Sequence, residues 1–207
     1  MPTTAADDDI AYVRRLAESG AHAPLKGGRF LAWWGLLVTV AYVAHHFALR
    51  QHPSGAAPVF GIIWISFAVL GFLGQMLLVR SMRAAPGGGS AGNRASRVVW
   101  GAGAGAIIAM VVGSGIAAQG PAGPHAMDWI VPLGFACYAC ALIVTGSLAR
   151  DRTVTLAGWG AIALVGLSAA LIASPYRYLL AAGGVALTVL LPGLLLLMRE
   201  PKASDRP

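Results

Sequence analysis

The feature that most constrains this chain is a series of six apolar segments, each about twenty residues long. The segments cover approximately residues 30–49, 59–79, 98–118, 128–149, 154–173 and 178–198. Each is long enough, at about 1.5 Å of rise per residue, to cross a hydrocarbon core of roughly 30 Å as an α-helix. None alternates polar and apolar residues as a membrane β-strand does. The sequence therefore predicts an all-α integral membrane protein with six transmembrane helices.

The composition agrees with a protein whose partner is the lipid bilayer. Hydrophobic residues make up 57% of the chain and charged residues 11%, whereas about a quarter of a soluble domain is charged. The net charge of +7 invites a nucleic-acid interpretation, but the basic residues do not form one patch with interleaved aromatic residues. No nucleic-acid partner is expected.

The basic residues instead divide unequally between the connections. Of the fifteen, only Arg50 and Arg177 fall on one side of the predicted membrane domain. By the positive-inside rule, the other side faces the cytoplasm, and both termini lie there. The small size, helical spans and charge bias favour a bacterial inner membrane.

The six segments are expected to pair as three antiparallel hairpins. Each hairpin begins with a Trp-Gly dipeptide and ends in an arginine, at Trp34 and Arg80, Trp100 and Arg150, and Trp159 and Arg199. This pattern indicates either a triplicated hairpin or the shared preference of tryptophan and arginine for the membrane interface.

Outside the membrane domain (residues 30–198), the chain has a cytoplasmic segment at 1–29 and a cytoplasmic tail at 199–207. Within the first segment, residues 7–19 place Ile10, Val13 and Leu16 at helical spacing after an acidic start. This pattern predicts a short amphipathic helix, which either binds a cytoplasmic protein or rests on the inner leaflet.

Two patterns inside the segments predict a close approach between helices and a kink in a helix. Gly101 and Gly105 are four residues apart in the third segment and allow another helix to approach closely. That helix belongs either to the same chain or to a second copy, as in a homo-oligomer. Pro192 followed by Gly193 predicts a kink in the last helix.

Polar residues of similar depth suggest a binding site in the outer half of the domain. No Asp, Glu, Lys or Arg occupies the centre of a segment, which weighs against ion-coupled transport. His45 and His46 are the exceptions to this apolar character. The ligand-binding hypothesis comprises Thr39, Tyr42, His45, His46, Ser66, Ser114, Tyr138, Ser168 and Arg177, with a rim of His52, His125, Asp128, Tyr176 and Tyr178.

Such a site fits a small polar or anionic ligand, a metal ion or a quinone-like headgroup. The alternative is that the histidines bond to water or neighbouring hydroxyls at the interface. A metal site would use His45, His46 and His125. Cys137 and Cys140, the only cysteines, are interpreted as packing residues because they lie in mid-helix without a nearby cation. The sequence does not identify a cofactor.

No catalytic residues are assigned, because no nucleophile and base occur together in the spans. The sequence does not support an enzyme, and no motif is specific to a family. The leading hypothesis is a non-enzymatic sensor, accessory or assembly subunit that binds a ligand in its outer half or a cytoplasmic partner through its N-terminal helix. The alternatives are a redox or metal- or haem-binding membrane protein and a small uncoupled transporter or channel.

Overall fold

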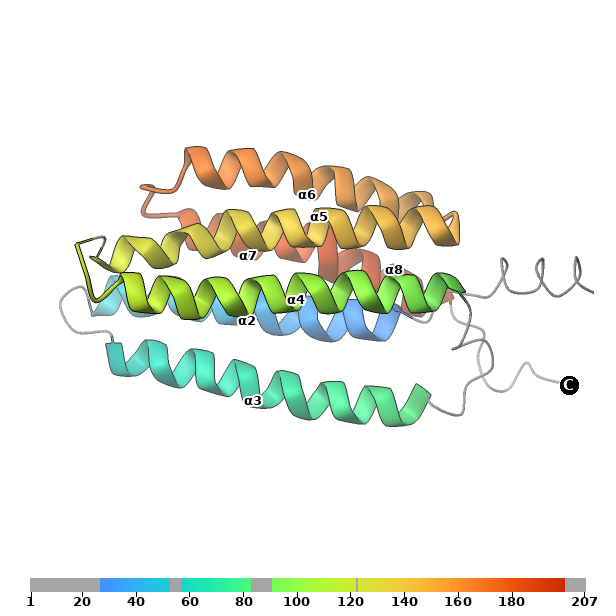
Figure 1. Cartoon of the computed structure of the whole chain (residues 1–207), viewed down its shortest axis with the longest axis horizontal. Coiled ribbons are helices and arrows are strands. Elements are labelled where there is room, and N and C mark those ends of the chain that lie inside the picture. Colours follow the sequence, from blue (N-terminus) through green and yellow to red (C-terminus); the bar gives the residue numbers. More distant parts are fainter. Residues whose placement is uncertain (1–26, 53–56, 83–90, 122, 200–207) are drawn as a thin grey trace, which may run out of the picture.

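The computed structural model describes residues 27–52, 57–82, 91–121 and 123–199 (Figure 1). In these residues, six helices are long and apolar enough to cross a membrane, which confirms the predicted number of spans. The spans are Gly28–Gln51, Pro58–Ser81, Gly92–Ala117, His125–Ala149, Arg152–Ala170 and Arg177–Arg199. The described part of the chain contains no strand. The fold is that of a multi-pass helical membrane protein.

The first three spans are formed by α2 (Gly28–Gln51), α3 (Ala57–Met82) and α4 (Ala91–Ala117). A short 3₁₀ helix, η1 (Gly123–Trp129), leads into α5 (Ile130–Ala149), and α6 (Arg152–Ala170) follows. The last span consists of α7 (Arg177–Val185), the π-helical turn η2 (Ala186–Leu190) and α8 (Leu191–Arg199). We call the end at which α2 stops and α7 starts the distal end, and the opposite one the proximal end.

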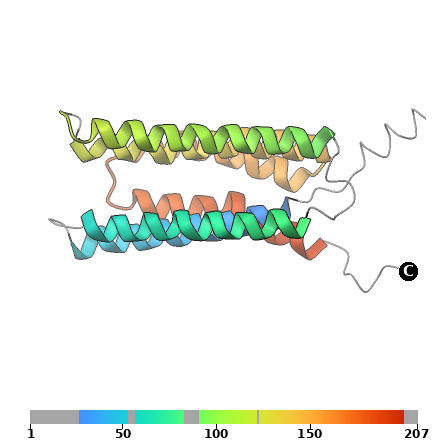
Figure 2. The same ribbon diagram turned by 60° about the horizontal axis from the view of Figure 1, so that its bottom comes forward.

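The helices form two layers of three, which Figure 2 shows one above the other. In one layer α5 packs between α4 and α6, and in the other α2 packs against α3, α7 and α8. The core lies where the layers meet, with Phe135 and Leu142 of α5 and Val185 and Val189 of the last span almost fully buried. The membrane domain is thus held together by an apolar seam between the layers.

The contacts within the three predicted hairpins are unequal. The pairs α2 with α3 and α4 with α5 do form extensive contacts, but α6 contacts α5 far more than it contacts α7. The last span packs on α2 instead, because small residues allow a close approach there. A Cβ atom at Gly35 would lie 2.7 Å from both the backbone N and Cα of Leu190. Gly193 similarly faces the backbone of Leu31 and Ala32.

The glycines of α4 do not provide such an approach within the chain. A Cβ atom at Gly101 or Gly105 would meet nothing within 4 Å, and both residues are exposed. Of the α4 glycines, Gly103 is the one at which an added Cβ atom would come nearest to a neighbour, 3.3 Å from the Cβ of Cys137. The interpretation of Gly101 and Gly105 as an internal packing face is therefore wrong for the described residues. Contact with a second copy stays a prediction.

The last span, in which Pro192 and Gly193 predict a kink, contains a π-helical turn just before the proline. The backbone N–H of Leu191 donates to the carbonyl of Ala186, five residues earlier. Pro192 follows directly and has no N–H to donate, so the normal hydrogen-bond ladder is broken at this point. The Thr188 hydroxyl donates to the carbonyl of Gly184 at 2.7 Å. The disruption is therefore spread over the turn that precedes the proline.

Two ion pairs connect the last span to the other layer. At the distal end Arg177 contacts Asp128, which lies in η1 just before α5. At the proximal end Arg199 contacts Asp151 at 3.4 Å, and Asp151 also caps α6 by accepting from the N–H groups of Thr153 and Val154. Asp128 and Asp151 are the only carboxylates among the described residues. Each of them therefore lies between the two layers.

The expected amphipathic helix at residues 7–19 lies outside the described residues. The same holds for its proposed contact residues Ile10, Val13 and Leu16, and for residues 200–207 of the C-terminal tail. The cytoplasmic partner surface therefore remains a prediction from the sequence.

Candidate functional site

The centre of the distal polar cluster is the carboxylate of Asp128, a residue that is only 4% exposed. Its Oδ1 accepts hydrogen bonds from Arg177 Nε at 2.9 Å and from the Tyr178 hydroxyl at 2.8 Å. Its Oδ2 lies 3.4 Å from Nδ1 of His125, an exposed side chain. A buried charge is costly unless it is paired and hydrogen-bonded, and Asp128 meets both conditions. This cluster joins the beginning of the α5 span to α7.

Arg177 reaches Asp128 because it is the first residue of α7 and its side chain runs back across the turn before the helix. One of its terminal nitrogens donates to the carbonyl of Ser174 at 3.4 Å. Its guanidinium carbon also lies 4.8 Å from the centre of the Tyr178 ring, a cation–π distance. The arginine is therefore held by a carboxylate, a carbonyl and an aromatic face.

His45 of α2 extends the polar network into the next helix. Its Nδ1 accepts a hydrogen bond from the indole N–H of Trp64 in α3 at 3.0 Å. Its ring stacks on Phe60 with ring centres 4.2 Å apart, and it lies equally close to the ring of Tyr178. Since Tyr178 donates to Asp128, contacts run without a break from α3 through α2 and α7 to η1.

Because the Nδ1 of His45 accepts from Trp64, its single proton is expected on Nε2. Long-range ¹H–¹⁵N spectra of the ¹⁵N-labelled protein in micelles should show this tautomer. Replacing Trp64 with phenylalanine should remove the preference and cost about 1 kcal/mol of stability, the net value of one hydrogen bond. The exposed His52 provides an internal control whose signals should not change. A proton on Nδ1 of His45 in the unmodified protein would contradict the assignment.

Tyr42 and His46 are two further predicted residues that the fold places in the distal half. Tyr42 is buried, with its ring centre 5.6 Å from that of Trp64 and 6.0 Å from that of Tyr178. His46 is 2% exposed, and its ring lies nearly parallel to that of Tyr176 at 6.1 Å. Tyr176 in turn contacts Arg50, whose guanidinium carbon lies 5.4 Å from the ring centre. The two adjacent histidines therefore have different neighbours.

Other predicted site residues do not join this cluster. Ser66 is exposed on α3, and the Ser168 hydroxyl donates to the carbonyl of Val165 in its own helix. Tyr138 packs against Trp100, with ring centres 6.1 Å apart. The hydroxyl of Thr39 is buried without a hydrogen-bond partner among the described residues. Similar depth along the helices therefore did not ensure that these side chains face the same neighbours.

The structure does not bring the three histidines of the metal hypothesis together. Within the described ranges, no group of three or more His, Cys, Asp or Glu side chains is arranged to hold a metal ion. His45 and His46 contact different aromatic residues, and His125 contacts Asp128. Cys137 and Cys140 are free thiols, half-buried and exposed respectively.

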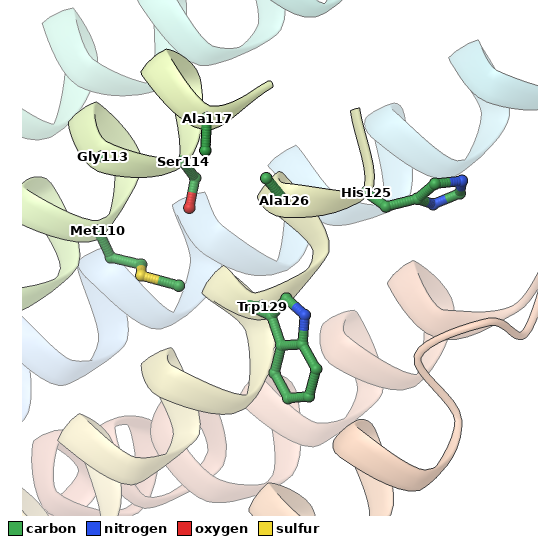
Figure 3. A pocket seen from close by; sticks show the side chains of 7 residues that line it. All are labelled: Met110, Gly113, Ser114, Ala117, His125, Ala126 and Trp129. Atoms are coloured by element: carbon green, nitrogen blue, oxygen red, sulfur yellow. The ribbon is translucent and has the colours of Figure 1, made fainter. Parts of the chain in front are cut away.

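A shallow hollow of about 440 Å³ adjoins the polar cluster, between the distal part of α4 and η1 (Figure 3). Its lining is mainly apolar and includes Met110, Ser114, Ala117, Ala126 and Trp129, with His125 at its edge. The Ser114 side chain lies on the α4 wall of the hollow, whereas the ring of His125 extends away from that wall (Figure 3). Of the predicted ligand-site residues, Ser114 lines this space, and His125 of the predicted rim lies at its edge.

Comparisons with known proteins do not narrow the class of protein beyond what the fold shows. No protein-family model, no curated protein and no solved structure matches this chain. The six apolar helices place it among the multi-pass helical membrane proteins. Any narrower function must be inferred from the polar cluster and the hollow beside it.

The sequence did not indicate three aromatic residues that complete these surroundings. Trp64 and Phe60 hold His45, and Trp129 lines the hollow. Trp64 lies in a helix that is apolar on all sides, so its sequence context carries no polar signal. The available clue was its depth, which matches that of His45 across the hairpin formed by α2 and α3.

Proposed function

We propose that this chain is a non-enzymatic sensor, accessory or assembly subunit of a bacterial inner membrane that binds a small ligand in its outer half. The observation that carries the proposal is the convergence of four segments on one polar cluster around a buried carboxylate. Side chains from α2, α3, η1 and α7 contribute to it. Ionisable groups inside a membrane domain are costly and mark functional sites by default. Contacts from so many segments also let a local change at the cluster affect the whole distal end.

The distribution of basic residues supports an orientation with both termini in the cytoplasm. Of the nine arginines among the described residues, only Arg50 and Arg177 lie at the distal end. The remaining seven lie at the proximal end, where the first span begins and the last one ends. By the positive-inside rule the proximal end is cytoplasmic, so the polar cluster faces the outer leaflet.

A sensor needs an element whose arrangement a ligand can change. The pair formed by Asp128 and Arg177 is such an element, because it joins the two layers at the outer end. A ligand that altered this contact would change how the layers meet. The cytoplasmic segment at residues 1–29 would then provide the surface that a partner protein reads.

Native mass spectrometry of the protein purified from its own membrane in mild detergent tests the proposal. We expect a bound small molecule that is lost from at least one of three variants, His45→Phe, Ser114→Ala and Tyr178→Phe. Each change keeps a similar shape but removes a polar group of the outer half, which reduces the hydrogen bonds available to a ligand.

The control is Ser81→Ala, which removes a hydroxyl from an exposed serine at the proximal end of α3. This variant should retain the bound mass. Ligand binding in the outer half would be contradicted if the protein carried no bound molecule. It would also be contradicted if a bound molecule were retained equally in all four variants.

A further inference from the structure

The hollow between α4 and η1 contains two polar groups without a protein partner. Ser114 is 5% exposed, and its hydroxyl makes no hydrogen bond with another described residue. The indole N–H of Trp129 likewise has no hydrogen-bond partner within the described ranges. The Ser114 hydroxyl is therefore free to donate to a molecule in the hollow. Both groups can donate a hydrogen bond, and the indole can only donate.

The rest of the lining determines what kind of molecule can occupy the hollow. Among the described residues that line it there is no Asp, Glu, Lys or Arg, and the only titratable one is His125 at the edge. Arg177, the nearest arginine along the polar cluster, is already paired with Asp128. An ionised headgroup would therefore lose its hydration without gaining an opposite charge, which is unfavourable. A neutral acceptor with an apolar body avoids this cost.

The hollow also lies at the depth where membrane amphiphiles carry their polar groups. Ser114 and Trp129 are each within about one helical turn of the distal end of their spans. Tryptophan at this depth is typical of the membrane interface, where its ring is in apolar surroundings and its N–H remains near polar groups. A ligand whose headgroup met both donors would have its tail in the hydrocarbon region.

We propose that this hollow binds a neutral amphiphile that accepts hydrogen bonds through carbonyl oxygens. The Ser114 hydroxyl and the Trp129 N–H donate to the carbonyls, and Met110, Ala117 and Ala126 contact the apolar part. Two sources carry this chemistry, the ring of an isoprenoid quinone and the acyl ester of a neutral glycerolipid. The inference rests on the proposed function, since it names the ligand class of the outer half.

Binding of two probes to the delipidated full chain in dodecyl maltoside, a detergent without carbonyl groups, tests this assignment. The probes are decylubiquinone and dioleoylglycerol, titrated separately and followed by native mass spectrometry. We expect saturable binding of at least one probe at a single site. Ser114→Ala and Trp129→Phe should each weaken it about 3- to 10-fold, the effect of losing one hydrogen bond.

The matched control is Trp159→Phe on α6. Trp159 is 58% exposed and Trp129 is 52% exposed, so the two changes remove an indole N–H from similarly accessible positions. The control should bind the probe as the unmodified protein does. Thermal unfolding of each variant checks that the fold is retained.

Each outcome has a defined meaning. Binding of decylubiquinone alone assigns the site to a quinone, binding of dioleoylglycerol alone assigns it to a glycerolipid ester, and binding of both supports the shared chemistry. Absence of saturable binding, or binding that neither Ser114→Ala nor Trp129→Phe weakens, overturns the inference. The probe experiment can fail while the native molecule of the previous experiment is still lost from His45→Phe or Tyr178→Phe. That result would retain the proposed function and reject only the assignment of the ligand to the hollow.

Discussion

Replacing Asp128 with alanine is expected to lower the free energy of unfolding by about 3–5 kcal/mol, the usual cost of breaking a buried ion pair by removing one partner. The change leaves the guanidinium of Arg177, which is 21% exposed, without its carboxylate. It also removes the acceptor of the Tyr178 hydroxyl, which is buried. Unfolding by sodium dodecyl sulfate in mixed micelles, followed by circular dichroism, measures the effect.

Replacing Arg199 with alanine provides the matched control at the opposite end of the last span. Arg199 is 58% exposed and lies 3.4 Å from Asp151, so its pair is worth at most about 1 kcal/mol. This variant leaves the capping hydrogen bonds of Asp151 in place. Equal losses for Asp128→Ala and Arg199→Ala would show that the distal pair is no more important to stability than an exposed one.

Replacing Gly35 with alanine is expected to destabilise the protein by about 1–3 kcal/mol, the usual cost of overpacking. The new Cβ atom would lie 2.7 Å from the backbone N and Cα of Leu190. A side chain could rotate away from such a contact, but the backbone can yield only if α2 and the last span move apart. The same denaturation assay measures the loss.

Gly105→Ala is the opposite case on α4. Its Cβ atom would meet nothing within 4 Å, and alanine is favoured over glycine in a helix by about 0.5–1 kcal/mol. We therefore expect Gly105→Ala to be neutral or stabilising while Gly35→Ala destabilises. A loss at Gly105 as large as that at Gly35 would indicate that another molecule packs against α4, which is the expectation for a homo-oligomer.

The sequence predicted the six spans because the length of an apolar run directly reflects the thickness of the membrane it crosses. It did not predict which helices share a layer. That choice depends on contacts between residues far apart in the chain, such as Gly35 with Leu190. Gly101 and Gly105 show the same limit, because a pair of glycines four residues apart permits close packing but does not specify a partner.

For the candidate site, the sequence predicted how deep the residues lie along their spans but not which way their side chains point. Tyr42, His45 and Arg177 were expected in the outer half, and the fold brings all three to the cluster around Tyr178 and Asp128. Ser66 has a similar depth but is exposed on α3, whereas Trp64, two residues earlier, donates to His45. Residues two apart point to nearly opposite sides of a helix, and a single apolar sequence does not reveal which side faces the bundle.

The two ion pairs described above give the last span an unusual mechanical position. Arg177 pairs its distal end with Asp128, and Arg199 pairs its proximal end with Asp151. A helix anchored at both ends cannot slide as a rigid rod without breaking one of its anchors. While both pairs stay intact, a change in the length or rotation of this helix is accommodated between them, where the π-helical turn Ala186–Leu190 precedes Pro192. That turn is the part of the last span that can adjust its conformation while both ends keep their ion pairs.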